Sequence, residues 1–202
     1  MIKTSSMIMD ELKDYANPAA KLGRMVKEGK YLPVTRGLYE TDPATAGYLL
    51  AGSIYGPSYL SFDFALSYYD MIPEAVYSFT SATYDKKKRK TYENLFGRFT
   101  YRDVPKEAYP LDIILATEGG YTFQIASPEK ALCDKLYTIS PAGNMKAAAE
   151  LLTGDLRIEP EVLVKLRIEV IESMADKYHC ANVYLLAKTL RKMRKYHIEQ
   201  RN

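Results

Sequence analysis

The sequence predicts an α+β protein, in which a minimal winged helix-turn-helix is followed by a mixed α/β domain with an antiparallel sheet flanked by helices. Residues 1–42 combine two helical patterns with a β-hairpin, and 74–126 are rich in β-branched and aromatic residues. From Ser127 onward the hydrophobic pattern is helical again. A change of composition after Asp42 separates a first domain, 1–42, from a second, 43–202.

The composition is that of an ordinary globular protein, because 47% of the 202 residues are hydrophobic and 26% are charged. The two cysteines lie far apart and outside any CxxC pair, which argues against a disulfide scaffold and a zinc site. Cys133 falls in an apolar helical pattern, so we expect it in the core. The first residues lack the apolar segment of a signal peptide, and no apolar run approaches a membrane span. We therefore expect a cytoplasmic protein.

Two short helices are predicted in the first domain. Ile8, Leu12 and Tyr15 follow an i, i+4, i+7 spacing and mark the inner face of the first helix. Asn17, followed by a proline, is a typical start for the second helix, which Gly29 should end in a left-handed conformation. The apolar stripe of this second helix comprises Leu22, Met25 and Val26.

A β-hairpin is predicted in the stretch KYLPVTRGLYE, residues 30–40, with its turn at Thr35-Arg36-Gly37. An isolated two-stranded hairpin is marginal in water, so it needs a partner to pack against. We expect it to share one small core with the two helices, formed by Leu12, Leu22, Val26, Leu32 and Leu38.

A helix, a basic helix and a basic-tipped hairpin occur in this order in a winged helix. There the second helix enters the major groove and the wing touches the DNA backbone or minor groove. The predicted DNA-binding residues are Lys21, Arg24, Lys27, Lys30, Thr35 and Arg36. The alternative is that these cations form only the solvated face of a helix and bind no DNA. It is favoured by the near-neutral charge of residues 1–42, which carry seven Lys/Arg and six Asp/Glu. A usual helix-turn-helix core also has three helices before the wing, whereas this segment has room for two.

The second domain begins with two predicted helices, TAGYLLAGSIY and LSFDFALSYYDMI. Ser61 is the expected N-cap of the latter, and Pro73 ends it. Four or five antiparallel strands should follow within 74–126, with a hairpin turn at 118–120 and a charged connection at 85–90.

The C-terminal part is predicted to be helical. Ser127 is a cap, followed by proline and glutamate in the first turn of a helix. The inward-facing residues of this helix are expected to be Ala131, Leu132, Leu136 and Tyr137. Three more helices are expected near 143–153, 160–177 and 181–199.

No catalytic constellation is evident, so we expect no enzyme, no metal and no cofactor. Leu50-Ala51-Gly52-Ser53, with Asp63 ten residues later, is similar to the opening of a nucleotidyltransferase signature. That chemistry needs two carboxylates at i and i+2 on a strand to hold two metal ions, but Ala65 occupies the second position. We interpret the match as chance. His179 and His197 are the only histidines, and neither has an acid and a nucleophile near it in the sequence.

Two further clusters of positive charge lie in the second domain. Residues 84–102 hold seven Lys/Arg and two Asp/Glu, and 186–202 hold six Lys/Arg and one Glu. This secondary basic patch comprises Lys86, Lys87, Lys88, Arg89, Lys90, Lys188, Arg191, Lys192 and Lys195. Each cluster taken alone is typical of a solvated surface. Both clusters together with a winged helix would instead indicate a surface that binds along the phosphate backbone of a nucleic acid.

Four stretches, taken in their order and spacing, resemble AbiEi-type antitoxins of bacterial abortive-infection systems. They are KLGRMVKEGKYLPVTRGLYETDP, YGPSYLSFDFALSYYDMIPE, FGRFTYRDV and QIASPEKALCDKLY. The resemblance covers most of the chain and is weakest after about Ala142. It implies an N-terminal winged helix and a larger C-terminal α/β domain. It also implies repression of the protein's own operon through inverted repeats, and a C-terminal domain that counters a nucleotidyltransferase-like toxin.

The resemblance therefore predicts an antitoxin and transcriptional autorepressor of a toxin–antitoxin operon. Its partners would be promoter DNA and the cognate toxin, countered directly or indirectly, with no membrane involved. The N-terminal segment is short for a full winged helix. The alternative is therefore a protein-interaction module with a degenerate winged helix that no longer binds DNA.

Overall fold

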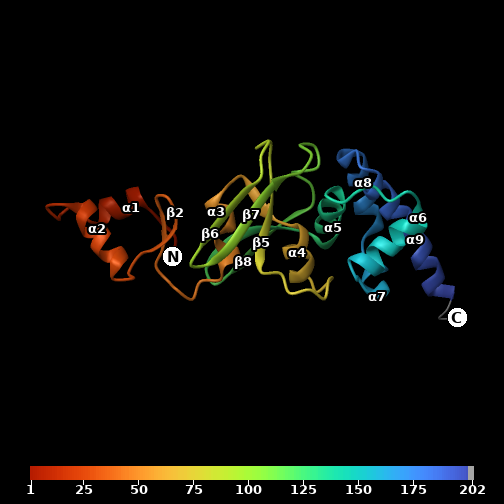
Figure 1. The fold of residues 1–202 in the computed structure, drawn as a ribbon, viewed down its shortest axis with the longest axis horizontal. Helices are drawn as coiled ribbons and strands as arrows, with labels where there is room; N and C mark the ends of the chain where they lie inside the picture. Colours follow the sequence, from red (N-terminus) through yellow and green to blue (C-terminus); the bar gives the residue numbers. More distant parts are fainter. Residues whose placement is uncertain (200–202) are drawn as a thin grey trace.

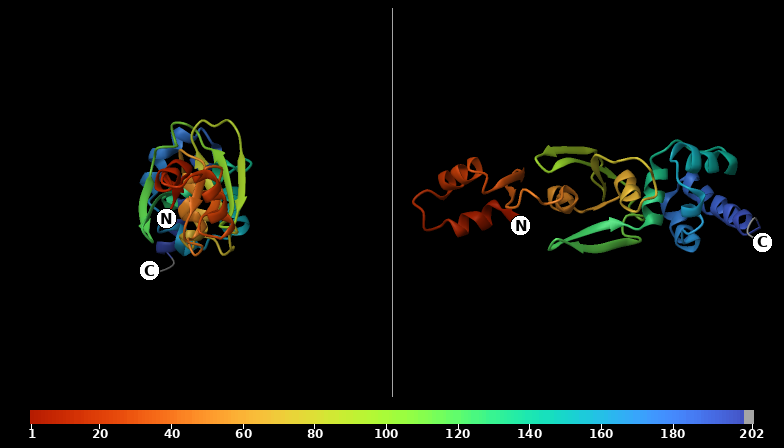
Figure 2. Two further views of the ribbon diagram at one scale, coloured as in Figure 1. Left: turned by 90° about the vertical axis from the view of Figure 1, so that its left-hand side faces the viewer. Right: turned by 90° about the horizontal axis from the view of Figure 1, so that it is seen from below.

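The computed structural model describes residues 1–199, which form an elongated molecule of three parts in a row (Figure 1). A small unit of helices and strands lies at the N-terminal end, a six-stranded sheet lies in the middle, and a group of helices lies at the C-terminal end. The view from below shows the same order, with the two ends of the chain far apart (Figure 2). The predicted α+β fold class is confirmed.

The N-terminal unit consists of β1 (Lys3–Thr4), α1 (Ser5–Glu11), α2 (Pro18–Lys27), β2 (Leu32–Thr35) and β3 (Leu38–Glu40). The predicted hairpin is confirmed, with the turn at Arg36 and Gly37 and with Thr35 as the last residue of β2. β1 pairs antiparallel with β3, so the sheet order is β1-β3-β2. Sequence patterns missed β1 because two residues are too few to show an alternation.

The helix α2 begins and ends as predicted. The side chain of Asn17 accepts a hydrogen bond from the Ala20 amide at 2.9 Å, and Pro18 is the first helical residue. Beyond Lys27 the chain leaves the helix through Gly29, whose φ of +74° is left-handed. The position of α2 is therefore fixed largely by local signals at its two ends.

Replacing Asn17 by alanine should lower the free energy of unfolding of the N-terminal unit by about 1 kcal/mol, because the Ala20 amide loses its acceptor. Asn17→Asp keeps a side-chain oxygen at the same place and should retain most of the stability. Urea unfolding followed by circular dichroism measures both variants. An equal loss in the two would contradict the capping role.

The small core of this unit differs in part from the prediction. Ile8, Leu12, Leu22 and Tyr31 are its buried residues, with Val26 among those packed against them. Leu32 and Leu38 instead belong to the main core, because alternate residues of a strand point to opposite faces of the hairpin. The prediction that Tyr15 faces inward was wrong: its side chain is 49% exposed, since α1 ends at Glu11.

The central sheet contains β4 (Ser58–Leu60), β5 (Ser78–Thr83), β6 (Lys90–Asn94), β7 (Gly97–Asp103), β8 (Ile113–Glu118) and β9 (Tyr121–Ala126). The strand order is β6-β7-β5-β4-β9-β8. The sheet is mixed rather than wholly antiparallel, because β5 pairs parallel with β7, and β4 with β9. β4 was not predicted: its last residue, Leu60, is the first residue of the predicted helix LSFDFALSYYDMI, and three buried residues in a row show no alternation. The turn at Gly119 and Gly120 is confirmed, both with positive φ.

The helices of the second domain are η1 (Gly47–Leu50), α3 (Ala51–Ile54), α4 (Phe62–Tyr68), α5 (Pro128–Tyr137), α6 (Met145–Glu150), η2 (Leu151–Asp155), α7 (Pro160–Leu163), α8 (Ile168–Tyr178) and α9 (Ala181–Glu199). α5 starts as predicted, with the Ser127 hydroxyl accepting from the Lys130 amide at 3.1 Å, and Cys133 lies in the core. Tyr137, predicted to face inward, is 38% exposed. No helix of residues 1–199 combines the length and the apolar character that crossing a membrane requires.

The single helix predicted for 160–177 is two helices, α7 and α8. The break between them is held by side chains from elsewhere in the chain: Glu129 accepts from the Arg167 amide at 2.8 Å. The Arg194 guanidinium donates to the carbonyl oxygens of Val164 and Leu166. A local hydrophobic pattern cannot show such a break, since its partners lie in α5 and α9.

The hairpin also joins the N-terminal unit to the central sheet. Val34 and Leu38 belong to the main core, and the Asn94 amide group donates to the Val34 carbonyl at 2.7 Å. Glu40 is buried and accepts from the Tyr121 hydroxyl at 2.8 Å. Burial acts to raise the pKa of Glu40, but hydrogen bonds from the N-terminal amine, Tyr121 and backbone amides hold it below its ordinary value. The hairpin is thus held on both sides of its turn, and the Gly37 carbonyl accepts from the Ser5 amide at 2.9 Å, while the Arg36 side chain at the turn remains exposed.

Candidate nucleic-acid interface

A groove of about 550 Å³ lies between α2 and the hairpin. The predicted DNA-binding residues Lys27, Thr35 and Arg36 line it together. Its other lining residues are small or apolar: Ala19, Leu22, Gly23, Val26, Pro33, Gly37 and Tyr39. The side chain of Arg36 is exposed at the turn, so the groove has a cation on each of its two walls.

The outward face of α2 carries two of the predicted cations. At about 3.6 residues per turn, Ala20, Arg24 and Lys27 share the side opposite the buried Leu22. Both cations lie in the last turn of α2, where they also interact favourably with the helix dipole. In a helix-turn-helix the N-terminal residues of the recognition helix contact base edges, and here the first three, Pro18, Ala19 and Ala20, are uncharged.

Lys21 and Lys30 do not line the groove. The Lys21 ammonium lies 4.8 Å from the centre of the Tyr15 ring, and Lys30 forms an ion pair with Glu28 at 3.0 Å. Both ends of this ion pair are exposed, and such pairs contribute at most about 1 kcal/mol. The structure thus brings together Lys27, Thr35 and Arg36, places Arg24 beside them, and leaves the other two lysines apart.

The basic cluster at 86–90 lies at the far end of β6 from the hairpin. The opposite end of β6, at Asn94, contacts the hairpin, and a strand of five residues spans about 16 Å. Lys86 lies over the Tyr55 ring at 5.1 Å, while Lys87 and Lys88 are exposed.

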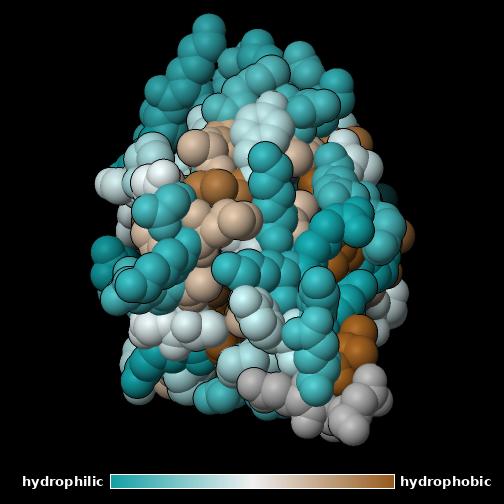
Figure 3. All heavy atoms as spheres, turned by 90° about the vertical axis from the view of Figure 1, so that its right-hand side faces the viewer, coloured by the Kyte–Doolittle hydropathy of each residue, from teal (hydrophilic) through white to brown (hydrophobic). Residues whose placement is uncertain are grey.

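The remaining members of the secondary basic patch lie on α9, at the other end of the molecule (Figure 1). Arg191 donates two hydrogen bonds to Glu172, and Lys195 lies 3.9 Å from the Glu199 carboxylate. Lys192 lies over the Tyr196 ring, and Lys188 is exposed. This end of the protein is covered mainly by hydrophilic side chains with apolar residues between them (Figure 3). The predicted cations therefore form three separate groups rather than one continuous surface.

Sequence analysis missed a buried polar network that joins α5 to the sheet and to α8. The Asp134 carboxylate accepts hydrogen bonds from the hydroxyls of Tyr59, Ser61 and Tyr178 at 3.0, 2.6 and 2.6 Å. It also pairs with Lys130 at 3.2 Å, and both charged side chains are fully buried. Burial, followed by the Asp134 charge, raises the pKa of both tyrosines well above its ordinary value.

This network is closed to solvent, so its role is structural. Lys130 also donates to the Ala108 carbonyl at 2.6 Å, which leaves no charged group in it without a partner. The Ser61 hydroxyl serves this network instead of capping α4, although Ser61 stands at the predicted N-cap position. The available signal was the i, i+4 pair of lysine and aspartate on the inward side of a predicted helix.

The segment with the chance nucleotidyltransferase match has a different arrangement from that signature. Asp63 is the second residue of α4, not part of a strand, and it pairs with Lys135 at 2.5 Å. Within residues 1–199 there is no group of three or more His, Cys, Asp or Glu side chains placed to hold a metal ion.

Comparison with known proteins adds no relative to this picture. No protein-family model matches the sequence, and no curated protein matches it either.

Proposed function

We propose that this protein is an antitoxin and transcriptional autorepressor of a bacterial toxin–antitoxin operon, of the AbiEi type that its motifs resemble. The observation that carries the proposal is the groove between α2 and the exposed hairpin tip, lined by Lys27, Thr35 and Arg36. In a winged helix these two elements lie against the major groove and the DNA backbone.

In the proposed complex, α2 enters the major groove and the hairpin is the wing. Arg24 reaches a base edge, and Arg36 meets a phosphate or the minor groove. Small residues on α2, Ala19, Ala20 and Gly23, allow its backbone to approach the DNA closely. Inverted repeats in the promoter would be read by two copies of the protein, because the symmetry of an operator mirrors that of a dimer.

The second domain, 43–202, is proposed to counter a nucleotidyltransferase-like toxin. The proposal requires a nucleotidyltransferase-like reading frame next to this gene, and the test is a growth assay with that neighbouring reading frame expressed alone or with this protein. We expect arrest in the first case and growth in the second. Arg36→Ala should rescue growth as well as the parent does, since Arg36 lies outside the second domain. Normal growth when the neighbouring reading frame is expressed alone, or growth arrest that persists when both proteins are present, would contradict the antitoxin assignment.

A second candidate function is a protein-interaction module whose winged helix no longer binds DNA. It is favoured by the packing of Val34 and Leu38 in the main core, which makes the hairpin a joint between two parts. The ion pair of Lys30 with Glu28 and the near-neutral charge of residues 1–42 favour it too. The two functions differ in one result: the module rescues growth but leaves promoter DNA unshifted in a gel.

A further inference from the structure

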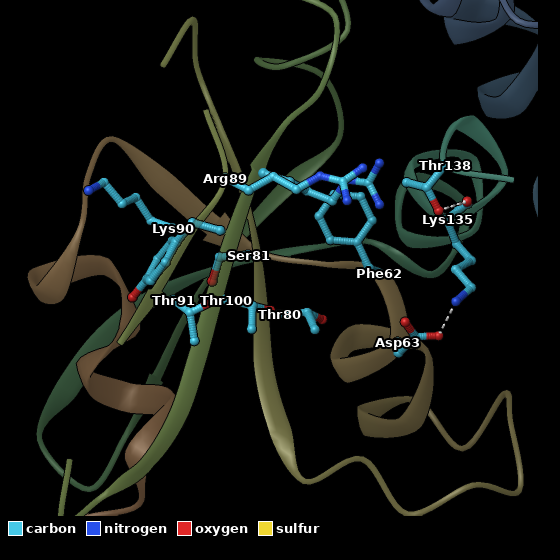
Figure 4. A pocket seen from close by; sticks show the side chains of 12 residues that line it. Phe62, Asp63, Thr80, Ser81, Arg89, Lys90, Thr91, Thr100, Lys135 and Thr138 are labelled. Atoms are coloured by element: carbon cyan, nitrogen blue, oxygen red, sulfur yellow. Dashed lines mark hydrogen bonds and ion pairs between the residues drawn. The ribbon is translucent and has the colours of Figure 1, made fainter. Parts of the chain in front are cut away.

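A cavity of about 290 Å³ lies between the central sheet and helices α4 and α5, apart from the groove of the wing. Figure 4 shows Arg89 reaching across it, over Phe62 and toward Thr138, while Lys90 points to the other side of the sheet. Lys135 turns toward Asp63 in the same view, and the two form the 2.5 Å ion pair. Most of the residues that line the cavity therefore carry a positive charge or a hydroxyl group.

Arg102 is the central cation of this cavity. It is half-buried, with its guanidinium 5.6 Å from the Phe62 ring. Among residues 1–199, neither Arg102 nor Arg89 forms an ion pair with a carboxylate, whereas Lys135 does. Burial lowers the pKa of Arg102, and the neighbouring Arg89 lowers it further. This arrangement is unfavourable, because the half-buried Arg102 lacks a partner that offsets its desolvation and has the like charge of Arg89 beside it.

Two hydroxyl groups complete the lining on the sheet side. Thr91 of β6 and Thr100 of β7 are directly paired across the ladder, and Arg102 shares their face because it lies two residues beyond Thr100. The Thr80 hydroxyl is already engaged with the Ser61 carbonyl and the Phe64 amide. Within residues 1–199, no hydrogen bond engages the hydroxyl of Thr91 or of Thr100, so both are available to a ligand.

We propose that this cavity binds a phosphoryl group, held by the guanidinium groups of Arg89 and Arg102 and by the hydroxyls of Thr91 and Thr100. The planar fork of arginine matches the oxygen atoms of a phosphate, and paired donors of this kind bind it with defined geometry. Of the four cations that line the cavity, Lys90 points away in Figure 4 and Lys135 is paired with Asp63. Arg89 and Arg102 therefore remain as an excess of two positive charges. This excess matches the charge of a phosphate dianion.

The size of the cavity limits the ligand. At about 290 Å³ it lies at the lower end of ligand pockets, so it accepts a phosphate or the phosphorylated end of a molecule rather than a large ligand. The phosphoryl group belongs either to a small phosphorylated molecule or to a nucleic-acid strand that passes the neighbouring loop at 85–90. The chemistry is the same in both cases, and experiment separates the two sources.

The test is calorimetric titration of the full chain with inorganic phosphate and with pyrophosphate at low salt. One binding site is expected. Arg102→Gln and Arg89→Gln should each weaken phosphate binding by about tenfold or more, the effect of losing one charge-assisted interaction. Arg191→Gln is the matched control, because Arg191 lies on α9 and is paired with Glu172. Its affinity for phosphate should equal that of the parent.

Thermal melting gives an independent readout. Phosphate should raise the melting temperature of the parent, because a ligand that binds only the folded state stabilises it, and should raise it less in Arg102→Gln. Without phosphate, Arg102→Gln should be at least as stable as the parent, since it removes a half-buried charge that has no carboxylate partner. Should Arg102→Gln not fold, Arg89→Gln carries the test, because Arg89 is exposed.

A non-operator DNA duplex identifies the source of the phosphoryl group. Duplex binding that phosphate competes away and that Arg102→Gln weakens assigns the group to a nucleic-acid strand. Duplex binding that is indifferent to Arg102→Gln, with phosphate binding still lost, assigns it to a small molecule. Absence of phosphate binding in the parent, or equal affinity in the parent and in both cavity variants, would overturn the proposal.

Discussion

Replacing Asp134 by alanine should lower the free energy of unfolding by about 3–5 kcal/mol, the usual effect of removing one partner from a buried ion pair. The substitution leaves the Lys130 ammonium fully buried with no opposite charge. It also removes the acceptor of three buried hydroxyls, those of Tyr59, Ser61 and Tyr178. Because these groups come from the sheet and from α8, the loss should loosen the packing between the two.

Urea unfolding followed by circular dichroism measures this effect, with Asp176→Ala as the control. Asp176 lies exposed on α8, so its loss should change stability by no more than about 0.5 kcal/mol. The double variant Lys130→Met with Asp134→Leu should recover the part of the loss that comes from the unpaired Lys130 charge, but not the part that comes from the three hydroxyls left without an acceptor. A loss of less than about 1 kcal/mol in Asp134→Ala, the typical value for one ordinary hydrogen bond, would show that the network contributes little.

Arg36→Ala and Arg24→Ala should impair DNA binding in two different ways. Arg36 is placed to meet the backbone, so its loss should weaken binding to all sequences about equally and flatten the log–log salt dependence by about 1. If Arg24 contacts a base edge, its replacement should weaken binding to the promoter by about 1–3 kcal/mol and reduce the discrimination between promoter and other sequences. Fluorescence anisotropy with promoter and scrambled duplexes at several salt concentrations measures both.

Lys146→Ala is the control for these variants, because Lys146 is exposed on α6 at the other end of the molecule. It should bind DNA as the parent does. Each of the three substitutions removes an exposed side chain, so thermal melting should show changes in stability within about 0.5 kcal/mol. If both arginine variants bind promoter DNA as tightly as the parent at every salt concentration, the hairpin is only a joint and not a wing.

Features encoded by a few neighbouring residues were predictable from the sequence. The cap at Asn17, the left-handed Gly29, the Gly119-Gly120 turn and the start of α5 at Ser127 are all confirmed. Each of these features depends on a side chain or a backbone conformation a few residues away in the sequence. Such local signals can be recognised without knowledge of the fold.

Features that depend on distant partners were not predictable. β1 and β4 are two and three residues long and exist because other strands pair with them. Which side of the hairpin Leu32 and Leu38 face depends on where the second domain packs. Local hydrophobic patterns do not predict these short strands or the side that the two leucines face, because the partner residues lie far away in the chain.

The candidate sites show the same limit. Positive charge in the sequence indicated Lys27, Arg36, Lys21 and Lys30 equally as DNA-binding residues. The fold brings Lys27 and Arg36 together in one groove, whereas Lys21 and Lys30 lie outside it. Arg102 was not predicted as a site residue, because its neighbours are set by the pairing of strands. In the folded sheet it shares a face with Thr91 and Thr100 and lies beside Arg89.

The proposed autorepressor binds the promoter of its own operon through its N-terminal unit. The most direct test is a gel-shift titration of the full chain with its promoter fragment and with a scrambled fragment of equal length. A repressor should bind the promoter on the order of a thousandfold or more tightly than the scrambled duplex, with affinity that falls steeply as salt rises. The same weak affinity for both fragments, or no shift of either at low salt, would contradict the claim.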